Sequence, residues 1–100
     1  MILPEDPFIR ELLPEFIDTW LEDLDNQFAP AISGRNTGEL YRLGHTLKGS
    51  CFQFSLDQIA QMGIDLMAYS KADDWDSALA LLPRIKQEFL TMKEEVAKLM

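Results

Sequence analysis

The chain is poor in cysteine and histidine, with one of each among its 100 residues. A single cysteine cannot form an internal disulfide, so the fold must depend on a packed apolar core, as is common in a reducing compartment. Hydrophobic residues make up 47% of the chain, which is ordinary for a globular domain and argues against disorder. We therefore expect one domain over residues 1–100, because this length is typical of a single domain.

Basic residues are also scarce: nine lysines and arginines face 17 acidic residues, giving a net charge of −8. Nucleic acids and anionic membranes both attract basic surfaces, so neither is an expected partner. Residues 1–12 are acidic and contain two prolines, whereas a signal peptide needs a basic start and an unbroken apolar run. No apolar run approaches the roughly 20 residues that cross a bilayer. We expect a cytoplasmic protein.

Strand patterns are absent, and the few turn signals divide the chain into helical segments. The clearest turn signals are SGRNTG at 33–38, SLD at 55–57 and KADDWD at 71–76. Between them, apolar residues recur at i, i+3, i+4 and i+7, which is typical of amphipathic helices. The first helix is expected over about 11–31, and the second from a cap at Asn36 or Thr37 to about Phe54.

The third helix is expected to begin at Ser55, which has Gln58 three residues later as in a capping box. The fourth is expected from near residue 74, with a bend at Pro83, while Pro30 should kink or end the first. The residues EDPF at 5–8 are a candidate for a short separate helix. The expected fold is all-α: an up-down antiparallel four-helix bundle with a short extra N-terminal helix.

The only histidine lies in the second of these helices, on the side away from its apolar stripe. At about 100° per residue, the apolar residues fall opposite His45 and should face the core. These residues are Leu40, Leu43, Leu47, Cys51 and Phe54. The same rotation puts Tyr41, Lys48, Gly49 and Phe52 within about 60° of His45. His45 is therefore expected in solvent and Cys51 in the core.

An exposed imidazole with a lysine and a glycine beside it suits phosphoryl acceptance. A neutral imidazole is a good nucleophile near neutral pH, and Lys48 is placed to neutralise phosphoryl oxygens. Gly44 and Gly49 each cost a helix interior about 1 kcal/mol, which suggests a close approach at His45. The plainer interpretation, a solvated surface histidine with no role, remains open, and so does a Ser-His-Asp arrangement.

Other motifs fit less well. GHTLKGS has the glycine spacing of a phosphate loop, but Ser50 stands where that loop requires lysine. His45 and Cys51 lie on opposite helix faces and cannot share a metal ion, and the acidic clusters lack the pattern of a calcium loop. No nucleotide-binding signature is present, so we expect neither an enzyme that uses ATP nor a cofactor.

The segment HTLKGS, His45 to Ser50, resembles the signature of histidine-containing phosphotransfer (HPt) domains of bacterial phosphorelays, and the helical pattern on both sides extends the resemblance over nearly the whole chain. The resemblance implies that His45 is phosphorylated by a receiver-domain aspartate and passes the group on. It further implies that Lys48 stabilises the phosphoryl group and that Gly49 leaves room for the receiver. The implied docking surface comprises Tyr41, Arg42, Phe52, Gln53 and Met67.

The resemblance also implies the partners: response-regulator receiver domains and an upstream hybrid sensor histidine kinase. Mg²⁺ is expected only on the receiver, and the phosphocarrier itself is expected to be a monomer. Three positions depart from the family pattern: Ser55 replaces a common glycine, Gly63 a common cysteine, and Met67 a common glutamine or glutamate that faces the histidine. With Met67 there, the orientation of His45 is expected to rest on water or Gln53.

Two alternatives stay open at this stage. The first is a helical interaction module that binds receivers without phosphotransfer, which the loss of the polar residue at Met67 favours. The second is a small metal-binding bundle that uses His45.

Overall fold

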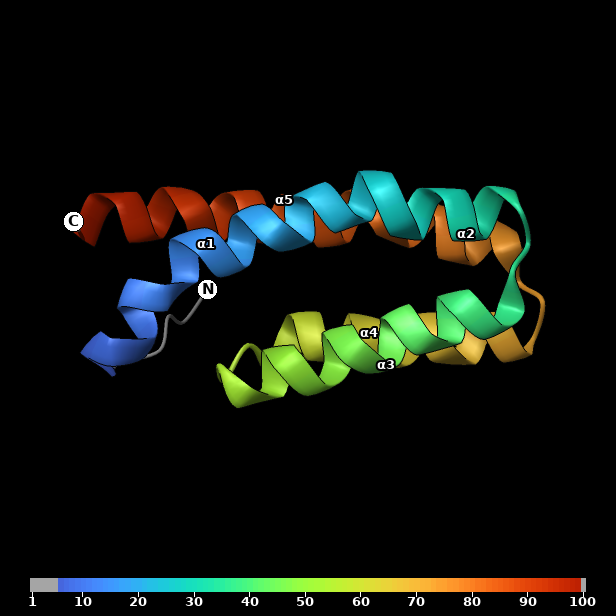
Figure 1. Ribbon diagram of the computed structural model, residues 1–100, viewed down its shortest axis with the longest axis horizontal. Coiled ribbons are helices and arrows are strands. Elements are labelled where there is room, and N and C mark those ends of the chain that lie inside the picture. The colour runs from blue at the N-terminus through green and yellow to red at the C-terminus, as the bar shows by residue number, and fades with distance from the viewer. Residues whose placement is uncertain (1–5, 100) are drawn as a thin grey trace.

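The computed structural model describes the backbone of residues 6–99 and the side chains of residues 6–98. This part of the chain is all-helical, contains no strand, and packs as four compact helices (Figure 1). The elements are α1 (Pro7–Asp23), the π-helical turn η1 (Leu24–Phe28), α2 (Ala29–Ser33), α3 (Thr37–Gln53), α4 (Asp57–Lys71) and α5 (Trp75–Leu99). The prediction of an all-α protein is confirmed.

The first of the four helices is the continuous run of α1, η1 and α2. Asp6 caps it by accepting a hydrogen bond of 2.9 Å from the backbone N–H of Phe8. Pro7 and Phe8 therefore form the first turn of α1 and belong to no separate short helix; Glu5 lies outside the described residues. Figure 1 shows the first turns of α1 at an angle to the rest, and Pro14 lies inside this helix.

Pro30 neither ends nor interrupts this helix, although the sequence predicted one or the other. The reason is that the helix widens into a π-helical turn just before Pro30. In η1 the N–H of Ala29 bonds the carbonyl of Leu24, five residues back. A proline has no N–H and its ring crowds the preceding turn, and a wider turn accommodates both. The helix then continues to Ser33, two residues beyond the predicted end.

Three short turns connect the helices at the predicted places, and each has the same geometry. Arg35, Ser55 and Asp73 all adopt left-handed φ angles, of 50°, 60° and 53°. After α3, the N–H of Ser55 bonds the carbonyl of Phe52, and the N–H of Leu56 bonds that of Cys51. This pair of bonds is a Schellman motif, and equivalent pairs end α2 and α4.

The predicted start of the third helix at Ser55 is wrong, because Ser55 terminates the helix before it. α4 begins at Asp57, its cap residue Leu56 makes no side-chain cap, and no capping box with Gln58 forms. The prediction for α3 is confirmed: the Asn36 side chain accepts a hydrogen bond of 3.1 Å from the N–H of Glu39.

The helices form two close pairs, α3 with α4 and α1–α2 with α5 (Figure 1). Figure 1 also shows the α2–α3 and α4–α5 connections at one end of the molecule, whereas the α3–α4 connection faces the other end, where α5 and the first turns of α1 extend past it. α5 passes without interruption through Pro83, which lies on its exposed side. At about 1.5 Å per residue, its 25 residues account for most of the 41 Å length of the molecule.

The backbones of α3 and α4 approach each other most closely at a pair of glycines. A Cβ atom on Gly44 would lie 2.8 Å from the carbonyl oxygen of Gly63, and a Cβ on Gly63 would lie 2.8 Å from that of Gly44. No side chain fits at either position without a shift of the backbone. This contact fixes how α4 lies against the helix that carries His45.

The core between the two pairs is made of large aliphatic and aromatic side chains. Its fully buried members include Phe28, Phe89, Leu13, Ile17, Leu40, Leu47, Ile59, Leu66, Ile85 and Met92. Within the described residues, no helix is both long and apolar enough to cross a membrane.

Candidate functional site

His45 lies in the middle of α3 with its side chain exposed to solvent. The apolar residues predicted on the opposite side are buried: Leu40, Leu43, Leu47 and Cys51. Phe54, at the end of α3, is half-buried and packs edge to face on Phe16, with ring centroids 4.3 Å apart. The prediction that the two faces of this helix carry the core and the histidine is confirmed.

The His45 imidazole makes no hydrogen bond or ion pair within the described residues. The contact expected with Gln53 does not form, because eight residues along an α-helix span about 12 Å. Both ring nitrogens are therefore available to an incoming group, and no side chain of residues 6–98 holds the ring in one orientation by a hydrogen bond.

Lys48 lies one turn after His45, at the edge of the α3–α4 contact. Its backbone nitrogen would be 2.8 Å from a Cβ on Gly63, and its side chain is half-buried. Among the residues described, no carboxylate forms an ion pair with it. Its charge is thus available to an anion beside His45.

Gly44 and Gly49 have different surroundings, and only Gly44 is required by packing. This corrects the expectation that both glycines allow a close approach at His45. Gly44 is buried and is required by the contact with Gly63. Gly49 is exposed, and a Cβ built on it would meet no atom within 4 Å. Packing inside this chain therefore does not require a glycine at position 49, and the surface beside His45 is open there.

Met67 of α4 lies against the backbone that carries the histidine. Its Cγ atom would be 3.1 Å from a Cβ on Gly44, the residue before His45, and its side chain is half-buried. A thioether is at best a weak hydrogen-bond acceptor, so Met67 offers no strong polar group at this contact with α3.

The other residues predicted for the docking surface differ in exposure. Phe52 is 47% exposed, which is high for a large apolar side chain, and Gln53 is also exposed. Arg42 is exposed but bonds Glu39 through its Nε atom at 3.1 Å. This hydrogen bond lowers the pKa of the Glu39 carboxyl and raises the pKa of Arg42, so the two charges largely offset each other. Tyr41 is half-buried.

Lys71 was not among the site residues predicted from the sequence, although it contacts Tyr41, a predicted docking residue. It is the last residue of α4, and its Nζ atom lies 5.1 Å from the centroid of the Tyr41 ring. Tyr41 is four residues before His45, so this contact brings a lysine of another helix toward the histidine face. Lys71 is four residues after Met67, and this spacing was the only sequence signal that pointed to it.

Cys51 is buried in the core, and this burial raises the pKa of its thiol to about 12. A thiol in this state stays protonated at neutral pH and is a poor nucleophile and metal ligand. Within residues 6–98, no group of three or more histidine, cysteine, aspartate or glutamate side chains is placed to hold a metal ion.

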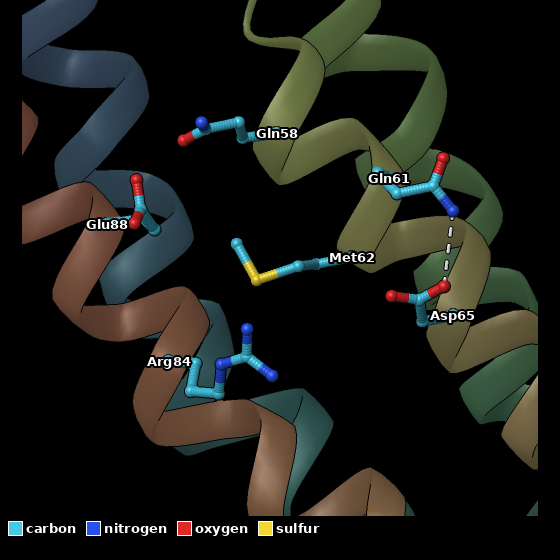
Figure 2. Close-up of a pocket in the computed structure, with 6 residues that line it drawn as sticks. All are labelled: Gln58, Gln61, Met62, Asp65, Arg84 and Glu88. Atoms are coloured by element: carbon cyan, nitrogen blue, oxygen red, sulfur yellow. Dashed lines mark hydrogen bonds between the residues drawn. The ribbon is translucent and has the colours of Figure 1, made fainter. Parts of the chain in front are cut away.

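A separate cleft of about 400 Å³ opens between α4 and α5 (Figure 2). Figure 2 shows Met62 and Arg84 pointing into it, while the side chains of Gln61 and Asp65 bond each other at 3.2 Å. On α4 these lining residues lie on the side turned away from Gly63 and hence from α3. This cleft is therefore not part of the site around His45.

Comparisons with protein-family models, with curated proteins and with solved structures found no match to this chain.

Proposed function

We propose that this protein is a histidine phosphocarrier of a phosphorelay, as the resemblance of HTLKGS to HPt domains implies. One observation carries the proposal: the only imidazole is exposed and unbonded within the described residues, and it stands beside a glycine that internal packing does not require. That glycine costs the helix about 1 kcal/mol, and the approach of a partner to His45 accounts for this cost.

The proposed step is the transfer of a phosphoryl group from an aspartyl phosphate to His45. The imidazole nitrogen that carries no proton donates its lone pair to phosphorus. The bond between phosphorus and the aspartyl oxygen breaks, and its electron pair leaves with the aspartate carboxylate. The second ring nitrogen keeps its proton until solvent removes it. Lys48 stabilises the charge on the phosphoryl oxygens, and the reverse sequence passes the group to another aspartate.

The proposed partner is a response-regulator receiver domain, phosphorylated by an upstream hybrid sensor histidine kinase. The receiver supplies the Mg²⁺-bound acidic site, so this chain has no need of a cofactor or of ATP. Phe52, Gln53, Tyr41 and Met67 provide the docking surface, whereas Arg42 contributes less because Glu39 already neutralises it. We place the exchange in the cytoplasm, with this protein as a monomeric up-down antiparallel bundle.

The test is phosphotransfer from a panel of ³²P-labelled receiver domains to the wild-type chain and to His45→Gln. We expect the wild type to acquire a phosphate that is labile in acid and stable in base, and the variant to acquire none. Thr46→Ala, an exposed change at the next residue of α3, is the control and should accept as the wild type does. Equal labelling of His45→Gln would exclude the proposed role.

One alternative has an observation in its favour: a module that binds receivers without accepting phosphate. Met67 lies against Gly44, the residue before His45, and the imidazole has no polar partner among the described side chains to orient it. This alternative predicts that receivers bind the wild type and His45→Gln equally and that neither becomes labelled. Receiver binding measured by calorimetry, in parallel with the labelling, separates the two functions.

A further inference from the structure

Lys71 ends α4 and contacts an aromatic residue of α3. Its ammonium group lies over the ring of Tyr41, 5.1 Å from the ring centroid. Tyr41 and His45 are four residues apart on α3, and such residues are neighbours on one helix face. The contact therefore brings the charge of Lys71, which comes from a different helix, to a neighbour of His45 on α3.

Among the described residues, the ion pairs of this acidic protein leave Lys48 and Lys71 without a carboxylate. Lys93 pairs with Asp18 at 2.7 Å and Lys98 with Glu95 at 3.7 Å, whereas neither Lys48 nor Lys71 has such a partner among the described residues. Three other basic residues also lack ion pairs among the described residues, and none of them lies on α3 or α4. They are Arg35, in the turn after α2, and Arg84 and Lys86, on α5.

The acidic residues closest in sequence to Lys71 make other contacts. Asp73 accepts a hydrogen bond of 3.4 Å from the Thr37 hydroxyl, and Asp74 accepts one of 3.2 Å from the N–H of Ser77. The first bond links the turn between α4 and α5 to the first residue of α3, and the second caps the start of α5. A chain with a net charge of −8 thus presents two available cations on the face that carries its only histidine.

We propose that Lys71 is a second cation for the phosphoryl group on His45 and that Tyr41 is the positioning residue that holds it nearby. This inference rests on the proposed function. Lys71 is exposed, and a cation–π contact at the protein surface is weak, so Lys71 can leave Tyr41 when a phosphoryl group binds. Lys48 approaches that group from α3 and Lys71 from α4.

The experiment measures phosphorylation of His45 by phosphoramidate, a small donor that needs no partner surface. The imidazole attacks phosphorus, the P–N bond breaks, and the nitrogen leaves with the electron pair as ammonia. The rate is compared among wild type, Lys71→Gln, Lys71→Arg and Lys86→Gln, with His45→Gln as the blank. Lys86→Gln removes the same charge from an exposed site on α5 and is the matched control.

We expect Lys71→Gln to react about two- to fivefold more slowly than Lys86→Gln at low salt, the effect of one partly exposed charge. Lys71→Arg should restore the rate because it keeps the charge, and the difference should shrink at about 1 M salt because exposed charges are then screened. A purely structural role would lower the melting temperature of Lys71→Gln without changing its rate.

The outcomes separate this inference from the function on which it rests. Equal rates for Lys71→Gln and Lys86→Gln, with an active wild type, overturn the role of Lys71 alone. A wild-type chain that reacts no faster than the His45→Gln blank overturns the proposed function and the role of Lys71 together.

Discussion

At the scale of single residues, Gly49 and Gly44 differ in their surroundings, although both lie on the helix that carries His45. The structure requires glycine at Gly44 and Gly63, where two backbones touch, but it leaves open space around Gly49. Spacing on a helix predicted the side on which Gly49 lies. It could not show that Gly44 and Gly49 differ in their surroundings, because Gly44 is required by its contact with Gly63 on another helix.

Substitution of Gly49 should separate stability from transfer. Gly49→Ala should raise the free energy of unfolding by about 1 kcal/mol, because the new Cβ meets nothing and alanine favours the helix. Gly49→Gln should slow transfer from a receiver about tenfold or more while leaving phosphoramidate labelling unchanged, because only the large donor needs the space. Denaturant unfolding and the two labelling assays measure these effects.

Gly38 provides the matched control, since it lies on α3 two turns before His45 and is also uncrowded. Gly38→Gln should leave both labelling rates unchanged. An equal loss in the two Gln variants, or no loss in Gly49→Gln, would contradict the role given to Gly49.

Cys51 should make stability depend on pH in the alkaline range. Burial raises the pKa of its thiol from 9.0 to about 12, so above pH 9 the unfolded chain releases a proton that the folded chain retains. The free energy of unfolding should therefore fall between pH 9 and 12. In Cys51→Ala the free energy of unfolding should fall less between pH 9 and 12, because the thiol is absent. Urea unfolding across that pH range measures the difference. Rapid reaction of the native thiol with a disulfide reagent at pH 8 would contradict its burial.

At the scale of helices and turns, three residues other than glycine end helices in left-handed conformations. This conformation depends on the hydrogen bonds of the whole turn, which explains why the sequence located the turn near Ser55 but placed the helix start two residues early. The π-helical turn η1 likewise could not be predicted from local sequence. Its last residue, Phe28, packs on Trp20 with ring centroids 6.1 Å apart. The presence of Pro30 indicated a disturbance there but not its form.

Ser55→Gly should stabilise the protein by roughly 0.5–1 kcal/mol, because glycine adopts a φ of 60° without the steric penalty that serine bears. Ser50→Gly, inside α3, is the control and should destabilise by about 0.5–1 kcal/mol. Thermal unfolding of the two variants measures the difference in sign. Destabilisation by both would show that Ser55 is not strained.

Gly63→Ala should destabilise the fold by about 1–3 kcal/mol, because its Cβ would lie 2.8 Å from backbone atoms of α3. The change should also slow phosphorylation of His45, since it moves the helix that carries Met67 and Lys71. Ala60→Gly, a buried change one turn earlier on α4, tests loss of packing without added crowding. If Gly63→Ala unfolds at the wild-type denaturant concentration, the close contact of α3 and α4 is wrong.

At the scale of the whole molecule, the sequence was sufficient to predict features that depend on a single helix, namely where the helices lie and which of their residues are buried. The apolar period identified the helices and assigned Leu40, Leu47 and Cys51 to the core. It could not predict what two helices create together: the contact of Gly44 with Gly63 and the position of Lys71 over Tyr41. These inter-helix contacts depend on how the pairs pack, and they define the surroundings of His45.

The most direct test of the central claim is to locate the phosphate after incubation with a phosphorylated receiver. Intact-mass and fragmentation spectra at alkaline pH, where phosphohistidine survives, would give its amount and position. We predict one phosphoryl group per chain, located at His45, and none in His45→Gln. A phosphate at any other residue, or an unmodified chain despite measurable receiver binding, would contradict the account.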